Sequence, residues 1–219
     1  MSGTVLDNDV LLKTAAWSLA AEVPAVLKDR GGPSVLAVTA IVVSRQLQRS
    51  KRIVNKDAAA AALSAMLASC LCLEPTKEEM ELAAGLETFA QERGVPLDSG
   101  ESLIAAVAAS RASASLLTGD KRAIEALEDV SNALGLTAQL AGKVVCLEQL
   151  MASIGLLRHP VELQTLVCAE VGVDGAMGMA FRCRSKAEVD AEALFEALRS
   201  YIDYLRSRAP MLLLPGYFI

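Results

Sequence analysis

Short runs of apolar and β-branched residues alternate along the chain with longer segments of helical periodicity. The short runs predict a buried strand at residues 4–6 and further strands at residues 35–41, 69–74, 115–118 and 144–147, with a helix end as the alternative at 69–74. Apolar residues spaced three and four apart predict helices at residues 10–27, 42–52, 57–68, 77–93, 100–111 and 121–134. Because strands and helices alternate, we predict an α/β fold of three layers, α/β/α, around a parallel sheet of about five strands.

Polar residues mark where several of these helices begin. Thr76 is followed three residues later by Glu79, which is the spacing of a capping box at the start of a helix. Asp57 and Asp98 are predicted N-caps, because a carboxylate at that position accepts hydrogen bonds from the first free amides of a helix.

The pattern changes after residue 155. Two further helices are predicted at residues 161–171 and 189–208, with a glycine-rich turn at 172–178 between them. We therefore predict a domain of residues 1–155 and a C-terminal helical extension of residues 156–219 that packs on it. The last residues, MLLLPGYFI, are apolar and are expected to pack on this domain or on a partner.

Composition agrees with a folded protein and limits its interactions with nucleic acid. Apolar residues make up 53% and aromatic residues 4% of the chain, so a large core must consist of Ala, Leu and Val. The net charge of −5 argues against a protein that coats nucleic acid through a strong positive field. It is compatible with a local basic groove, or with a nuclease whose metal-binding acids supply part of the negative charge.

The cysteines and the charge pattern predict a soluble cytoplasmic protein without membrane association. Five cysteines lie in apolar settings and predict reduced, buried thiols: Cys70, Cys72, Cys146, Cys168 and Cys183. The longest uncharged run, residues 58–73, is shorter than the roughly 20 residues that span a bilayer. Acids stand where the basic region of a signal peptide would be, so none is expected.

Three acids follow predicted strands or open a predicted helix. Asp7 follows the first strand, Asp120 follows the fourth, and Glu101 opens the helix between them. A parallel sheet brings the carboxyl ends of its strands to one edge, so we expect these acids to meet there. Carboxylates this close repel one another, and a divalent cation with a preference for oxygen ligands, Mg²⁺ or Mn²⁺, would relieve that repulsion.

The sequences VLDNDVLL, PLDSGESLIAAVAAS and LLTGDKRAIEAL, in this order, resemble the motifs of the PIN-domain family of metal-dependent ribonucleases. The resemblance covers about residues 4–150. It implies that Asp7, Glu101 and Asp120 bind Mg²⁺ or Mn²⁺ and catalyse hydrolysis of single-stranded RNA. Thr118 matches a hydroxyl residue that orients the site, and Asp9 stands where the family often has Asn, as a supporting group or an extra ligand.

The chain departs from the family pattern at two positions. The acid that usually follows the second strand is missing, and Ser44 and Arg45 occupy that region. Arg122 stands where a second acid often follows Asp120. The sequence therefore predicts a reduced site of three acids, with Asp9 and Asp98 as candidate substitutes.

Several candidate residues also have simpler interpretations. Asp7 could cap the first helix, and Asp98 is more typical of an N-cap than of a ligand. Lys121 and Arg122 either bind phosphate or are exposed helix-start cations. The basic cluster Arg45, Arg49, Lys51 and Arg52 is a candidate RNA path or a solvated helix end. His159, in a loop, is not expected to act as a base.

The expected function is that of a divalent-metal-dependent endoribonuclease. A non-enzymatic alternative is a degenerate PIN-like module that binds RNA or a protein, or that self-associates through the C-terminal extension. A third interpretation, a haloacid-dehalogenase-like phosphatase with Asp7 as nucleophile, fits less well because Leu11 replaces the Ser or Thr typical of that family.

Overall fold

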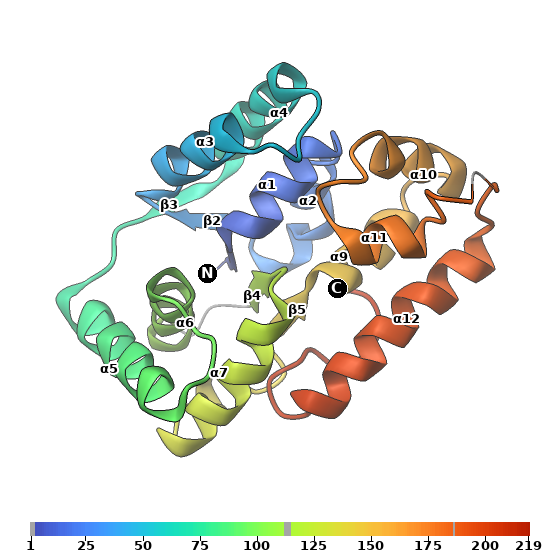
Figure 1. Ribbon diagram of the computed structural model, residues 1–219. Helices are drawn as coiled ribbons and strands as arrows, with labels where there is room; N and C mark the ends of the chain where they lie inside the picture. The colour runs from blue at the N-terminus through green and yellow to red at the C-terminus, as the bar shows by residue number, and fades with distance from the viewer. Residues whose placement is uncertain (1–2, 112–114, 186) are drawn as a thin grey trace.

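Five parallel strands form the central layer of the molecule, in the order β3-β2-β1-β4-β5 (Figure 1). The computed structural model describes residues 3–111, 115–185 and 187–219. The strands are β1 (Thr4–Leu6), β2 (Pro33–Leu36), β3 (Leu71–Leu73), β4 (Ser115–Thr118) and β5 (Val144–Cys146). The register pairs Thr4 of central β1 with Pro33 on one side and Ser115 on the other. The prediction of a three-layer α/β/α fold is confirmed.

Alternate residues of the strands enter two hydrophobic cores on opposite faces of the sheet. Leu6 and Leu117 belong to the first core, whereas Val5 and Leu116 belong to the second, as the two-residue period of a strand requires. The first core is covered by α1 (Asn8–Ala16), α2 (Glu22–Val26), α3 (Thr39–Arg49), α4 (Lys56–Ser69) and α9 (Leu147–Gly155). The second is covered by α5 (Lys77–Arg93), α6 (Ser99–Ser110), α7 (Lys121–Ala133) and α8 (Thr137–Leu140).

The segment after residue 155 packs into both cores. Its helices are α10 (Pro160–Ala169), α11 (Gly175–Ala180) and α12 (Ala191–Arg208). Leu194 and Leu198 of α12 contribute to the first core, and Ile202 and Leu205 contribute to the second, so α12 runs past the β5 edge of the sheet (Figure 1). The predicted domain boundary near residue 155 remains a prediction.

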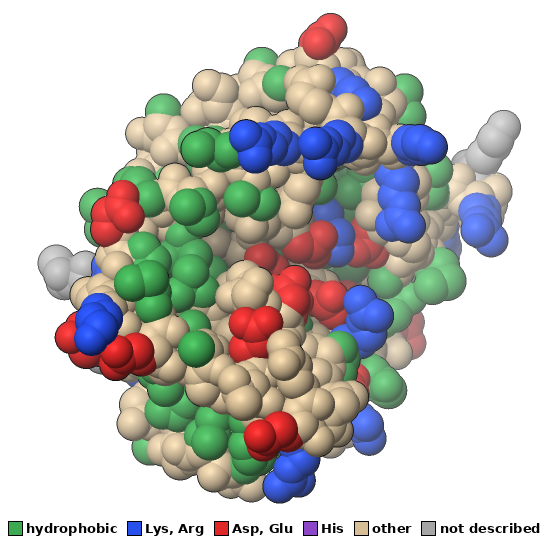
Figure 2. Space-filling view, turned by 60° about the vertical axis from the view of Figure 1, so that its left-hand side comes forward, with side chains coloured by type: hydrophobic (Ala, Val, Ile, Leu, Met, Phe, Trp, Pro, Cys, Tyr) green, Lys and Arg blue, Asp and Glu red, His purple; other side chains and the backbone are tan. Residues whose placement is uncertain are grey.

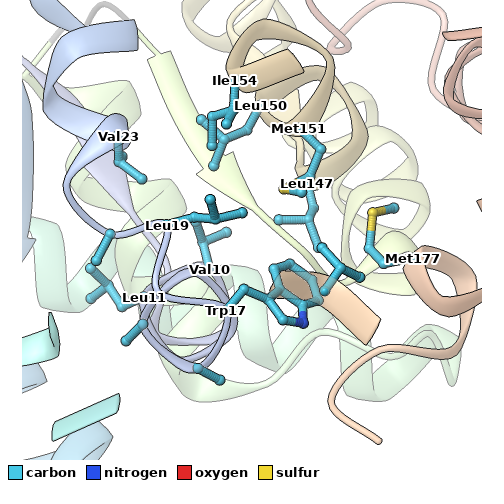
Figure 3. Packing of buried hydrophobic residues seen from close by; sticks show 14 of the residues in the cluster. Val10, Leu11, Trp17, Leu19, Val23, Leu147, Leu150, Met151, Ile154 and Met177 are labelled. Carbon is cyan, nitrogen blue, oxygen red and sulfur yellow. The ribbon is translucent and has the colours of Figure 1, made fainter. Parts of the chain in front are cut away.

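The first core is built around Trp17, which is 1% exposed. Figure 3 shows Trp17 at the end of α1, with Leu147 of α9 and Met177 of α11 close by. Because α11 supplies Met177 to this core, burial of apolar surface fixes α11 against the N-terminal helices.

The apolar tail lies against the edge strand β5. Leu213 forms a parallel bridge with Val144, and Val144 donates its amide to the Leu212 carbonyl at 2.9 Å. The Glu128 carboxylate accepts hydrogen bonds from the amides of Met211 and Leu212 at 3.1 and 2.9 Å. The tail therefore closes this edge of the sheet, whose backbone groups would otherwise be open to pairing with another chain.

Two predicted elements differ from the structure in the first third of the chain. The helix expected at residues 10–27 is two helices, α1 and α2, with a break between them where Ser18 has a left-handed φ of 56°. Pro24 has no amide hydrogen for the helical bond to the residue four positions earlier, so it is tolerated only in the first turn of α2. The strand expected at 35–41 ends at Leu36, and its β-branched continuation belongs to α3. Thr39, Val43 and Leu47, four residues apart, form the buried side of that helix.

Two polar signals were also misread. Asn55, rather than Asp57, caps α4, and its side chain accepts from the Ala58 amide at 3.1 Å. The glycine-rich segment at 172–178, predicted as a turn, contains the start of α11, whose N-cap Asp174 accepts from the Met177 amide at 3.0 Å. Asp174 supplies the capping oxygen that offsets the low helix propensity of the glycines.

The prediction of five reduced, buried thiols was wrong. Cys168 and Cys183 form a disulfide, with a Cα–Cα distance of 5.1 Å. Cys168 is in α10 and Cys183 follows α11, so the packing of these two helices against each other brings the cysteines together. Cys72 is exposed, and Cys146 is buried as expected.

No helix among the described residues is both long and apolar enough to cross a membrane.

Candidate functional site

A pocket of about 1020 Å³ opens at the carboxyl ends of β1 and β4. Six acids line it: Asp7, Asp9, Asp98, Glu101, Asp120 and Asp174. Figure 2 shows acidic side chains gathered in the hollow and a row of basic side chains above it. Asp7, Glu101 and Asp120 thus line one pocket, and their joint role as a site stays a prediction.

Asp7 occupies the N-cap position of α1, but its side chain makes no capping hydrogen bond. Its Oδ2 instead accepts a hydrogen bond from the Thr118 hydroxyl at 2.8 Å. Burial raises the pKa of Asp7 to about 6; the hydrogen bond from Thr118 opposes this rise, and the charge of Asp9 adds to it. The side chain is therefore directed across the strand end into the pocket, and the simple capping interpretation does not describe it.

Glu101 and Asp98 form a capping box at the start of α6. The Asp98 carboxylate accepts from the Glu101 amide at 2.8 Å, and the Glu101 carboxylate accepts from the Asp98 amide at 2.9 Å. Burial raises the pKa of Glu101 to about 7; the Asp98 amide opposes the rise, and the charges of Asp98, Asp120 and Asp7 add to it. Asp98 is thus the N-cap of α6, as predicted from the sequence. Its side chain also lines the pocket.

Asp120 caps α7 and is held by hydrogen-bond donors. Its Oδ1 accepts from the amides of Arg122 and Ala123 at 2.8 and 3.3 Å, and its Oδ2 accepts from the Arg122 guanidinium at 3.3 Å. Burial acts to raise the pKa of Asp120, but these hydrogen bonds together hold it below its usual value. Arg122 therefore compensates part of the charge of the neighbouring aspartate.

Asp9 and Asp174 share one lysine. Lys13 Nζ lies 2.7 Å from Asp9 Oδ2 and 2.7 Å from Asp174 Oδ2. Gly119 is packed directly against this group, since a Cβ at that position would lie 2.3 Å from Asp9 Oδ2. Burial raises the pKa of Asp9 despite the charge of Lys13. For Asp174 burial also acts to raise the pKa, but the charge and hydrogen bond of Lys13, together with the Met177 amide and the charge of Lys121, lower it.

The two basic residues after Asp120 lie in different surroundings. Lys121 Nζ is 2.6 Å from Oε1 of the buried Glu148 and 4.4 Å from the centroid of the Tyr201 ring. The side chain of Arg122 is 78% exposed. Lys121 is therefore anchored by the protein, while Arg122 remains accessible to a ligand.

The basic cluster of α3 is divided by the fold. Arg49 and Arg52 line the pocket, whereas Arg45 and Lys51 are not among its lining residues. The loop after Arg52 is fixed by Glu170, whose carboxylate accepts from the amides of Val54 and Asn55, both at 2.7 Å. Two arginines of this cluster thus line the same pocket as the acids.

Lys13 and Asp174 were missed in the sequence. The spacing of Asp9 and Lys13, four residues apart on a helix, was a signal that could have identified Lys13. Asp174 lies far along the chain, after the PIN-like motifs, and no local pattern connects it to Asp9. His159 is the N-cap of α10, where its Nδ1 accepts a hydrogen bond from the Val161 amide at 3.4 Å.

The donor set fits a hard divalent cation by its chemistry. All six acids offer oxygen, and burial, with a smaller contribution from neighbouring acids, raises the pKa values of Asp7 and Glu101. Within residues 3–111, 115–185 and 187–219, however, no three carboxylate, imidazole or thiol side chains are grouped so that they could hold a metal ion. Glu101 and Asp120 are turned to their capping partners instead.

The chain matches no protein-family model and no curated protein. Among solved structures it is similar to VapBC2 from Rickettsia felis bound to a DNA fragment from their promoter. That similarity has a TM-score of 0.42 and 12% sequence identity, and it covers 59% of this chain and 93% of the other. The fold and the pocket define the chain as an α/β protein with an acidic pocket at the carboxyl edge of a parallel sheet.

Proposed function

We propose that the protein is a divalent-metal-dependent endoribonuclease that cleaves single-stranded RNA in this pocket. The observation that carries the proposal is the convergence of Asp7, Glu101 and Asp120 on one pocket, in which two of the three carboxylates have raised pKa values. The resemblance of the surrounding motifs to PIN domains supports the same function. The C-terminal extension is a further candidate surface for a protein partner or a second copy.

Asp7, Glu101 and Asp120 would hold Mg²⁺ or Mn²⁺. Binding requires Glu101 and Asp120 to exchange capping hydrogen bonds for metal contacts, while Thr118 keeps Asp7 directed into the pocket. The bound metal would supply an activated water and neutralise charge at the phosphodiester.

The arginines are placed to bind the substrate. Arg49 and Arg52 line the same pocket as the acids, and the exposed Arg122 lies beside Asp120. Guanidinium groups bind phosphate oxygens in a bidentate manner, which suits the backbone of a single strand passing through the pocket.

Substitution of the acids tests this function. Asp7→Asn and Asp120→Asn should each reduce Mn²⁺-dependent cleavage of a single-stranded RNA by more than about a hundredfold, because each removes a charged ligand. Asp57→Asn is the matched control, since Asp57 is exposed in the first turn of α4, outside the pocket. Equal cleavage by the Asp120→Asn variant and the unmodified chain would refute the proposal.

A second candidate function, a PIN-like module that binds RNA or protein without cleavage, is favoured by one observation. Asp120 is paired with Arg122, Asp9 and Asp174 are paired with Lys13, and the acid expected after β2 is absent. Titration of the unmodified chain with Mn²⁺ separates the two functions. A lack of binding, together with retained affinity for single-stranded RNA in a chelator, would identify the module.

The phosphatase alternative gains no support from the surroundings of Leu11. Leu11, at the position where that family carries a hydroxyl, is fully buried in the first core and cannot contact a substrate.

A further inference from the structure

Lys13 is held between two carboxylates that come from distant parts of the chain. Asp9 lies one turn earlier on α1, and Asp174 caps α11 in the C-terminal segment. Both carboxylates lie 2.7 Å from the ammonium nitrogen, and the lysine side chain is only 11% exposed. An ammonium group this buried needs such partners, because removal from water disfavours its charge.

The surroundings keep Lys13 charged and in place. Burial acts to lower the pKa of Lys13, but the charges and hydrogen bonds of Asp9 and Asp174 outweigh it and raise the pKa. On the third side is Gly119, the residue between Thr118 and Asp120, where a Cβ would lie 3.3 Å from the ammonium nitrogen. Lys13 therefore lies within the acidic pocket, next to the strand end that positions Asp120.

We propose that Lys13 is a built-in cation of the pocket, whose ammonium group occupies a site between Asp9 and Asp174 and withholds these two carboxylates from a divalent ion. Asp7, Glu101 and Asp120 are then the carboxylates left for one exchangeable ion. The assignment of this exchangeable ion to Asp7, Glu101 and Asp120 rests on the proposed function. The assignment of the Lys13 ammonium group to the site between Asp9 and Asp174 does not.

The proposal explains why Asp9 and Asp174 are on the pocket wall without being free for ligands. One ammonium group leaves a single net negative charge on the pair of carboxylates. Removal of the ammonium group would leave two unpaired, largely buried carboxylates facing each other, which is an arrangement that a hard divalent cation stabilises.

The test is the number of Mn²⁺ ions bound by the metal-free full chain, measured by electron paramagnetic resonance of free Mn²⁺ during titration. Lys13→Met should bind one ion more than the unmodified chain, and Lys13→Arg should bind the same number as the unmodified chain. Lys77→Met is the matched control, because Lys77 also pairs with an acid four residues away but is 81% exposed; its count should not change. Addition of Asp9→Asn to Lys13→Met should remove the extra ion.

Loss of the buried ammonium group should also lower the melting temperature of Lys13→Met in a chelator, and saturating Mn²⁺ should restore it. If the variant is unfolded without metal, recovery of its helical circular dichroism on addition of Mn²⁺ supports the proposal, and no recovery overturns it. Equal Mn²⁺ counts for folded Lys13→Met and the unmodified chain also overturn it. An unmodified chain that binds no ion, beside a Lys13→Met variant that binds one, refutes the proposed nuclease and supports the role of Lys13.

Discussion

Two pairs of carboxylates in the same pocket differ in how their charge is compensated. Asp7 and Glu101 have raised pKa values, whereas Asp120 and Asp174 have lowered ones. Burial acts on all four in the same direction. The difference therefore reflects both how deeply each carboxylate is buried and which partners it has, because the pKa of Asp9 is raised by burial although Lys13 contacts it.

The raised pair has only neutral donors, and the lowered pair has cations. Asp7 accepts from the Thr118 hydroxyl and Glu101 from a backbone amide. Asp120 is paired with the Arg122 guanidinium and Asp174 with the Lys13 ammonium group. The half of the pocket formed by Asp7 and Glu101 is therefore where an added cation would gain most, since no cationic side chain is paired with either carboxylate among the salt bridges of the described residues.

The largest expected effect is on stability when Asp7 loses its charge. The pKa of Asp7 is about 6 in the folded state and 3.8 in the unfolded state, so ionisation of Asp7 opposes folding, and stability is lost as the pH rises through this window. In a chelator, Asp7→Asn should raise the free energy of unfolding at pH 8 by up to about 3 kcal/mol and have little effect at pH 4. Urea unfolding at both pH values measures this. The Asp120 carboxylate is already compensated, so Asp120→Asn should not raise the free energy of unfolding at pH 8. A rise as large as that of Asp7→Asn would contradict the proposed difference between the two pairs of carboxylates.

The next largest effect is the pH dependence of metal binding. Ligand carboxylates must be ionised, and Asp7 and Glu101 have pKa values of about 6 and about 7. Affinity for Mn²⁺ should therefore fall by about a hundredfold or more from pH 8 to pH 5, with proton uptake on metal release. Calorimetry in buffers of different ionisation enthalpy measures both quantities. An affinity that is constant over this range would show that neither carboxylate is a ligand.

Substitution of Gly119 tests the part of the pocket in which Asp9 and Asp174 are paired with Lys13. A Cβ at this position would lie 2.3 Å from Asp9 Oδ2, so Gly119→Ala must displace Asp9 from Lys13, at a cost of about 1–2 kcal/mol. Gly85→Ala is the control, because nothing lies within 4 Å of a Cβ there and helix α5 should gain about 0.5–1 kcal/mol. In a double-mutant cycle measured by urea unfolding, Asp9→Ala should abolish the cost of Gly119→Ala. An unchanged cost would mean that contact with Asp9 is not its cause.

The predictable part of the fold is the part that local sequence controls. The capping box of Thr76 and Glu79 placed α5 correctly, and the apolar run at residues 115–118 gave β4. The β-branched run at 35–41 was misread because its side chains are divided between β2 and α3, and tertiary packing decides that division. Pro24 was an overlooked local signal for the break after α1.

In the candidate site, too, the residues placed by local sequence and sheet topology were predictable, and those placed by tertiary packing were not. Asp7, Glu101 and Asp120 follow strands or open a helix, so the topology of a parallel sheet was enough to place all three along one pocket. The partners that set their charge are less visible in the sequence. The contact between Lys13 and Asp174 depends on how α11 packs against α1. The disulfide of Cys168 and Cys183 depends on how α11 packs against α10.

The smallest expected effect separates capping from charge at Asp98. Asn caps a helix about as well as Asp, so Asp98→Asn should change stability by less than about 0.5 kcal/mol. It removes a negative charge that helps to raise the pKa of Glu101, and that pKa should therefore fall. Carboxyl-carbon NMR titration measures the shift, and Asp190→Asn, at the N-cap of α12, is the control. An unchanged pKa for Glu101 would mean that the charge of Asp98 does not contribute, and that burial and the other acids of the pocket raise it without Asp98.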